Sequence, residues 1–183
     1  MNENQKSVYT LGAEDGLLLG PVMALTAVLF GASTYFGFLF IPALISAFAV
    51  PVITYFRLAL SFRKGHTASS FSAIWLHGIC MYFFGGLIMS VVVYVALRWL
   101  DPGFIAHQID IVVNAYSGIN DPQAQTLVNT FEKLKESGSL PTALDTTLEL
   151  LYFAVFTGSI LSLIYSAVIR RRNKRPVPPP FEG

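Results

Sequence analysis

A run of thirty residues, from Phe71 to Leu100, limits what this chain can fold into more than any other part of the sequence. The run is apolar almost throughout, contains no acid, and has His77 and Arg98 as its only basic side chains. As a helix it would reach about 45 Å, which exceeds the roughly 30 Å of a bilayer's hydrocarbon core. A soluble domain rarely has a use for a helix that is apolar on every face. The run therefore predicts a membrane-spanning helix.

The composition supports this interpretation and extends it to the whole chain. Of the 183 residues, 54% are hydrophobic and 13% are charged, whereas soluble domains average about 25% charged residues. We predict an all-α integral membrane protein with four transmembrane helices in two hairpins. The predicted spans are residues 16–33, 36–60, 71–100 and 147–169. They form a single membrane domain at 1–175, with a helical extracytoplasmic insert at 101–146 and a disordered proline-rich tail at 176–183.

Small residues recur along one face of several predicted spans. Such stripes allow two helix backbones to approach closely in lipid, where dispersion contacts replace the hydrophobic effect. We favour packing within the chain over a dimer seam as their role. The predicted helix-packing positions are Gly12, Gly16, Gly20, Gly78, Gly85, Gly158, Ser162 and Ser166.

Proline marks several predicted helix boundaries and irregularities. Asp101 with Pro102, and Asp121 with Pro122, each predict an N-cap followed by proline at the first helical position. Pro42 and Pro51 lie inside the second span, where each removes a backbone donor and favours a kink. Broken helices can mark transport sites, but prolines are also ordinary in membrane helices.

The distribution of basic residues predicts the orientation. Cytoplasmic segments of membrane proteins carry an excess of Lys and Arg. Four spans place both termini and the loop between the second and third spans on the same side, whereas the predicted insert is acidic. The basic side is therefore predicted to be cytoplasmic. It carries nine of the twelve Lys and Arg residues: Lys6, Arg57, Arg63, Lys64 and the five between Arg170 and Arg175.

Few ionisable residues lie inside or at the border of the predicted spans, where a proton relay or a ligand site in the membrane would need them. His77 is a candidate for a proton relay or a ligand site, but the sequence offers it no obvious partner, and an ordinary hydrogen bond is the favoured interpretation. Arg98, Asp101 and Glu149 are expected at a similar height near the outer border. They would form an ion-pair cluster that holds the insert, or alternatively bind a polar headgroup or solute.

The sequence gives no sign of an enzyme. It contains neither a phosphate-binding glycine loop nor a hydrolase or zinc-protease motif. Its single cysteine, Cys80, excludes an intrachain disulfide and a zinc site built on several thiolates. We expect no catalysis, cofactor, metal or nucleic acid.

Several features together resemble a known family. They are DGLLLG at the start of the first span and the basic loop, followed by SSFSAIWLHGICMYFFGGLIMSVVVYVALRWLDP. The acidic insert and the arginine-lysine cluster after the last span complete the pattern. This layout resembles a family of four-span inner-membrane proteins, domain of unknown function 4199, found widely in Bacteroidetes. The resemblance implies a bacterial cytoplasmic membrane and brings no assigned reaction or binding residues.

Two functions remain open from the sequence. The favoured one is a non-enzymatic scaffold that binds another membrane component, or itself, within the bilayer. The small-residue stripes and the amphipathic insert support it. The alternative is a small oligomeric transporter or channel that uses the proline-containing second span and His77.

Overall fold

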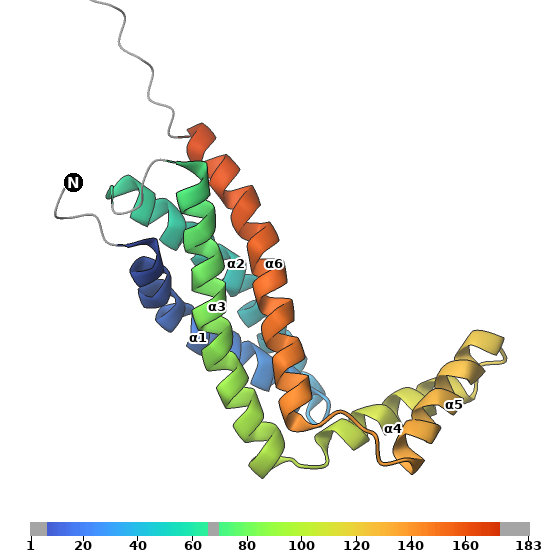
Figure 1. The fold of residues 1–183 in the computed structure, drawn as a ribbon. Helices are drawn as coiled ribbons and strands as arrows, with labels where there is room; N and C mark the ends of the chain where they lie inside the picture. Colours follow the sequence, from blue (N-terminus) through green and yellow to red (C-terminus); the bar gives the residue numbers. More distant parts are fainter. Residues whose placement is uncertain (1–6, 66–69, 173–183) are drawn as a thin grey trace, which may run out of the picture. The chain divides into compact units, whose positions relative to one another are not determined.

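The computed structural model describes residues 7–65 and 70–172. Within these residues the chain is helical and contains no strand (Figure 1). The long helices are α1 (Val8–Ser33), α2 (Phe40–Arg63), α3 (Phe71–Val95) and α6 (Ala143–Arg172). A 3₁₀ turn, η1 (Gly37–Leu39), precedes α2, and a π-helical turn, η2 (Ala96–Leu100), continues α3. Two shorter helices follow, α4 (Phe104–Ser117) and α5 (Pro122–Glu136).

The four long helices confirm the predicted fold class. The segments Val8–Ser33, Gly37–Arg63, Phe71–Leu100 and Ala143–Arg172 are each long and apolar enough to cross a membrane. Large apolar side chains point outward from them, as at Phe48 and Phe156, which are 71% and 68% exposed. Exposing such apolar surfaces to water is unfavourable, whereas the hydrocarbon core of a bilayer accommodates them. The protein is therefore an integral membrane protein.

The first two spans differ in detail from what the sequence suggests. Helix α1 begins at Val8, so that Glu14 and Asp15 lie inside it rather than just before the apolar run. Helix α2 continues without a break through Pro51, and Pro42 lies in its first turn, where helical N–H groups have no intrahelical acceptor to lose. The second span is therefore not a broken helix. Lys6, residues 66–69 of the basic loop and the predicted tail at 176–183 lie outside the described residues.

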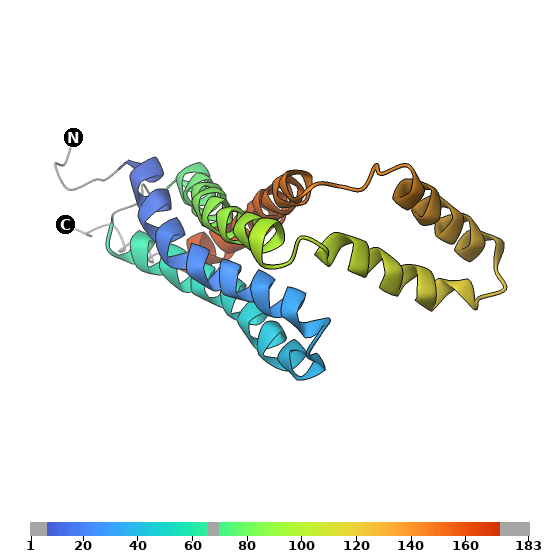
Figure 2. The ribbon, with the colours of Figure 1, turned by 90° about the horizontal axis from the view of Figure 1, so that it is seen from below.

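The chain divides into two compact units. Unit 1 comprises Met1–Met89 and Leu151–Gly183, and unit 2 comprises Ser90–Leu150. In unit 1, α1 and α2 run side by side (Figure 2). Buried Leu58, Ile74 and Ile169 form an apolar cluster that joins α2, α3 and α6.

Glycines set the spacing of the helices in unit 1. A Cβ on Gly12 would lie 2.3 Å from the Cβ of Cys80, and one on Gly20 would lie 2.7 Å from Cδ1 of Ile88. These two glycines therefore bring α1 against α3 over two turns and more. On α6, a Cβ on Gly158 would lie 2.0 Å from the ring of Tyr82. The backbones approach so closely only because these positions lack side chains.

The remaining predicted packing positions also lie between helices of unit 1. A Cβ on Gly78 would lie 2.2 Å from Oγ of Ser162, and one on Gly85 would lie 3.2 Å from Sδ of Met23. Ser162 and Ser166 are fully buried. Ser166 Oγ donates to the Ser162 carbonyl at 2.6 Å, whereas Ser162 Oγ has no hydrogen-bond partner among the described residues.

Unit 2 contains the helical pair α4 and α5. The predicted start at Asp121 is confirmed, since its carboxylate accepts a hydrogen bond from Gln123 N at 3.2 Å and Pro122 opens α5. The predicted start at Asp101 is wrong. Asp101 instead ends η2, and α4 begins at Phe104 after Gly103. Asp101 is the C-cap residue of this π-helical turn, and its backbone N–H donates to the Ala96 carbonyl at 2.9 Å, so the aspartate ends one helix instead of starting the next.

Candidate functional site

Three helices of unit 1 each contribute one ionisable side chain to a buried cluster. Asp15 of α1 accepts hydrogen bonds at Oδ1 from both Nε and Nη2 of Arg57 of α2, with Nε at 2.8 Å. Its other oxygen, Oδ2, lies 3.0 Å from Nε2 of His77 of α3. Both oxygens of one carboxylate are thus held by basic groups from two other helices. We call Asp15, Arg57 and His77 the Asp15 triad.

The Asp15 triad is largely removed from water. His77 is 0% exposed and Asp15 is 4% exposed, whereas the Arg57 side chain is 37% exposed and reaches the surface. An isolated carboxylate in such a place would be very unfavourable, and pairing with the Arg57 guanidinium together with the hydrogen bond to His77 offsets that cost. Ionisable residues inside membrane spans are rare and are functional-site candidates by default.

The three side chains lie at the same level of the bundle. Asp15 is seven residues after Val8, Arg57 is six before Arg63, and His77 is six after Phe71. Each is therefore about 9–10 Å along its helix from the same end of unit 1. Figure 1 shows these helix ends together with the end of α6. We call this end the basic end, because Arg63 and Arg170–Arg172 lie in the last turns of α2 and α6.

The glycine contacts explain why Asp15 reaches His77. Gly12 and Gly16 flank Asp15 on α1, and a Cβ on Gly16 would lie 2.7 Å from Cβ of Phe84 and 2.9 Å from the Met81 carbonyl. Because α1 and α3 lie so close together, the short side chain of Asp15 is long enough to reach from one helix to the other. Arg57, in contrast, uses a long side chain to reach the same carboxylate from α2.

A small pocket leads to the Asp15 triad. Its volume is about 160 Å³, and it lies between α1 and α2. The lining residues are Leu11, Glu14, Asp15, Arg57, Leu60, Ser61 and Lys64. Sites for drug-sized ligands measure about 300–1,000 Å³, whereas about five waters at roughly 30 Å³ each would fill this volume. The pocket therefore suits water or a small ion rather than a large ligand.

Further hydrogen bonds continue from the Asp15 triad along the inner face of α2. Thr54 Oγ1 donates to Tyr82 Oη at 3.2 Å, and Thr26 Oγ1 lies 2.7 Å from Ser46 Oγ. Ser46, Thr54 and Ser61 are all buried. With Arg57 these residues fall within about 80° on the helix wheel and extend over about 22 Å. We call this row, Ser61, Arg57, Thr54 and Ser46, the polar face of α2.

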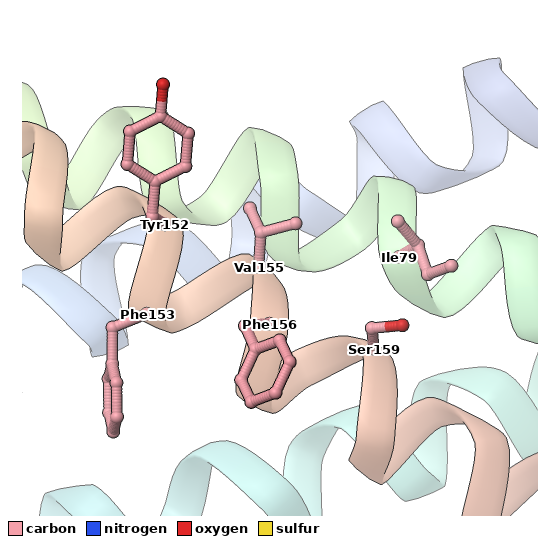
Figure 3. Close-up of a pocket in the computed structure, with 6 residues that line it drawn as sticks. All are labelled: Ile79, Tyr152, Phe153, Val155, Phe156 and Ser159. Atoms are coloured by element: carbon pink, nitrogen blue, oxygen red, sulfur yellow. The ribbon is translucent and has the colours of Figure 1, made fainter.

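A larger hollow lies between α3 and α6 and has a different character. Its volume is about 660 Å³, and it is lined by Ile79, Tyr152, Phe153, Val155, Phe156 and Ser159. None of these six residues is charged. Tyr152 and Phe153 point in opposite directions from α6, so the hollow is open rather than enclosed (Figure 3). This surface suits acyl chains, and Tyr152 and Ser159 contribute the hydroxyl groups in its lining.

The predicted polar positions differ in their burial and in their contacts. His77 has the partner that the sequence did not reveal. In unit 2, Arg98 and Glu149 are exposed and Asp101 is half-buried. The ion pair found in this unit joins Lys135 to Asp110 at 2.6 Å, between α5 and α4. A cluster of Arg98, Asp101 and Glu149 stays a prediction.

Sequence reasoning missed two of the three residues of the Asp15 triad. The predicted first span begins at residue 16 and leaves Asp15 just outside it. The predicted second span, 36–60, contains Arg57, but the sequence indicates only its role in orientation, whereas in the structure it binds Asp15. A signal was available, since one acid, one arginine and one histidine lie at similar depths in three neighbouring apolar segments.

The comparisons with known proteins give the family. A family model described as "Protein of unknown function (DUF4199)" matches residues 14–171, which include the whole Asp15 triad. The chain belongs to this family, and the predicted resemblance is confirmed. No curated protein and no solved structure matches it.

Proposed function

We propose that this member of the DUF4199 family is a small non-enzymatic transporter that moves protons through the Asp15 triad. The observation that carries the proposal is a buried carboxylate held between His77 and Arg57 at the end of a polar pocket. A carboxylate in this position can take a proton from water in the pocket and keep a hydrogen bond to His77 in either protonation state. The polar face of α2 supplies further hydroxyls deeper in the bundle.

The imidazole of His77 suits this role because its ring nitrogens can exchange donor and acceptor roles between tautomers. When Asp15 is ionised, His77 Nε2–H donates to Oδ2 across the 3.0 Å contact. When a proton reaches Nδ1, Nε2–H passes its own proton to Oδ2, and the resulting carboxyl group then donates to the unprotonated Nε2. The carboxyl group therefore stays in place during the exchange, which is what a proton relay requires.

We propose that the basic end faces the cytoplasm of a bacterium, in its inner membrane, with both chain termini on that side. The arginines in the last turns of α2 and α6 support this orientation, because cytoplasmic flanks are enriched in Lys and Arg. The pocket would then give the Asp15 triad access to cytoplasmic water.

Proton flux tests the proposal. In proteoliposomes with an internal pH dye, KCl and valinomycin, we expect wild-type protein to dissipate a pH gradient faster than empty vesicles do. Asp15→Asn removes the titrating group and should reduce the rate to that of empty vesicles. His77→Gln should slow it by about a hundredfold, the usual scale for losing a positioned proton-transfer group.

Matched controls lie in unit 2. Asp110→Asn and His107→Gln change the same residue types at half-buried and exposed positions of α4, and they should leave the flux unchanged. A wild-type flux equal to that of empty vesicles would refute transport. Equal rates for wild type and Asp15→Asn would remove the Asp15 triad from any flux that exists.

A scaffold role is a second candidate, and the surface of the α4–α5 pair favours it. Ile111, Tyr116 and Leu127 are 41%, 43% and 38% exposed there, on helices connected to the spans by short links. Changing these three residues to Ser should abolish any stoichiometric partner that co-purifies with the intact protein in mild detergent. A protein that purifies alone, with or without the changes, would count against this role.

A further inference from the structure

We propose that the pocket beside the Asp15 triad binds a small monovalent anion, and that it does so together with a proton on Asp15. This inference rests on the proposed function and names the co-transported species. It is carried by the balance of charges in the pocket, by the way Arg57 is held and by the size of the space.

The charges that line the pocket cancel while Asp15 is ionised. Glu14 and Asp15 of α1 line the pocket together with Arg57 of α2 and Lys64, the C-cap residue of α2. Two negative and two positive groups leave no net charge to attract a free anion. The guanidinium of Arg57 is occupied by Oδ1 of Asp15 through Nε and Nη2.

Protonation of Asp15 removes this balance. The carboxylate accepts one proton from pocket water at Oδ1 and becomes a neutral carboxyl group, while Oδ2 still accepts from His77 Nε2–H. Arg57 then loses its counter-ion, and the lining residues carry a net charge of +1. Arginine binds anions through several parallel N–H groups, and its side chain is 37% exposed. One anion entering the pocket restores neutrality, so that one proton and one anion occupy the site together.

The other groups packed around Asp15 do not provide the cation that an incoming anion would bind. From α3, fully buried His77 contacts Oδ2, and Cys80 packs against Gly12. The charged group of α6 that is tied to α2 is Arg172, whose Nη1 donates to Tyr55 Oη at 3.1 Å. Arg57 is therefore, among the described residues, the cation that directly pairs with Asp15 and is released by its protonation.

The volume of the pocket limits which anions can bind there. A space of about 160 Å³ accepts a chloride ion, or an anion of similar size, with a few waters at roughly 30 Å³ each. Gluconate has about the volume of the whole space and would leave no room for water, so it serves as the poorly fitting reference anion. The binding free energy of the anion and that of the proton are coupled, so each should strengthen the binding of the other by the same factor.

The test measures proton uptake when chloride replaces gluconate at constant ionic strength. Purified full-length protein in a non-ionic detergent is held in weak buffer with a pH dye, and chloride binding is followed independently by ³⁵Cl line broadening. We expect saturable broadening and the uptake of about one proton for each chloride bound. Chloride binding without proton uptake, or no saturable binding at all, would overturn the inference.

Three variants separate the parts of the exchange. Asp15→Asn imitates the protonated acid and should bind chloride with no proton uptake. Arg57→Gln should lose saturable binding. Lys64→Gln, which leaves the Asp15 triad intact, should weaken binding by about tenfold, the scale of one charge-assisted contact. Asp110→Asn should behave as wild type. Retained binding in a folded Arg57→Gln variant would contradict the inference, as would unchanged affinity in Lys64→Gln.

The outcome is distinguishable from that of the transport proposal. If proton flux in liposomes is equally fast in gluconate and in chloride, the transport proposal stands and the anion inference fails. If chloride binds with proton uptake in detergent but vesicles show no flux, the site is real and the transport proposal fails.

Discussion

Replacing Asp15 with Ala is expected to lower the free energy of unfolding by about 3 kcal/mol, at the low end of the range for breaking a buried ion pair. The low end applies because the Arg57 side chain is 37% exposed and part of its charge reaches polar surroundings. The cause is the guanidinium, which remains inside the bundle without its carboxylate. Unfolding of the purified protein by SDS titration in mixed micelles measures the change.

A double variant distinguishes two causes of instability, namely the lost attraction between Asp15 and Arg57 and the charge that a single substitution leaves unpaired. Asp15→Leu with Arg57→Met removes both charges and should recover most of the stability, because apolar replacement of a buried pair is often neutral or better. Asp110→Ala breaks the exposed pair with Lys135 and should cost less than about 1 kcal/mol. A double variant as unstable as the sum of its single variants would show that Asp15 and Arg57 are not energetically coupled, which would contradict the pair.

Replacing Gly16 with Ala is expected to lower the stability by about 3 kcal/mol, the upper end of the range for overpacking. The new Cβ would lie 2.7 Å from Cβ of Phe84 and 2.9 Å from the Met81 carbonyl oxygen. Backbone atoms and Cβ atoms cannot turn away as the end of a flexible side chain can. Helix α1 must therefore shift away from α3, and the contact between Asp15 and His77 lengthens with it.

The matched control is Gly37→Ala, because no atom lies within 4 Å of the position its Cβ would occupy. It should leave both unfolding in SDS and proton flux unchanged. Gly16→Ala, in contrast, should lower both. If Gly16→Ala is as stable as wild type, the close approach of α1 and α3 is not what positions Asp15.

Much of the fold follows from the sequence because lipid imposes a simple rule. Backbone groups in hydrocarbon must be satisfied within the segment, so long apolar runs become helices. The run from Phe71 to Leu100 does so as expected, with a π-helical turn at its end. Asp121 and Pro122 likewise start α5, since capping acts over a few neighbouring residues.

The Asp15 triad could not be predicted in the same way, because its members are distant in sequence and each has a plausible local role. Asp15 and Arg57 are 42 residues apart, and Asp15 and His77 are 62 apart. A charge beside an apolar run is ordinarily at the membrane border, so the predicted first span leaves Asp15 outside it, and Arg57, near the end of the predicted second span, is interpreted only as a sign of orientation. Their attraction depends on tertiary packing of α1, α2 and α3, which no hydropathy window contains.

The most direct test of the account is the contact between Asp15 and His77 in a lipid bilayer. Solid-state NMR of protein labelled with ¹³C at aspartate carboxyl carbons and with ¹⁵N at histidine ring nitrogens reports this contact through dipolar recoupling, with Asp15→Asn and His77→Gln to assign it. The account predicts strong recoupling that disappears in either variant, since Oδ2 and Nε2 are 3.0 Å apart. Recoupling that is absent, or that survives both substitutions, would contradict the Asp15 triad and the proposals that rest on it.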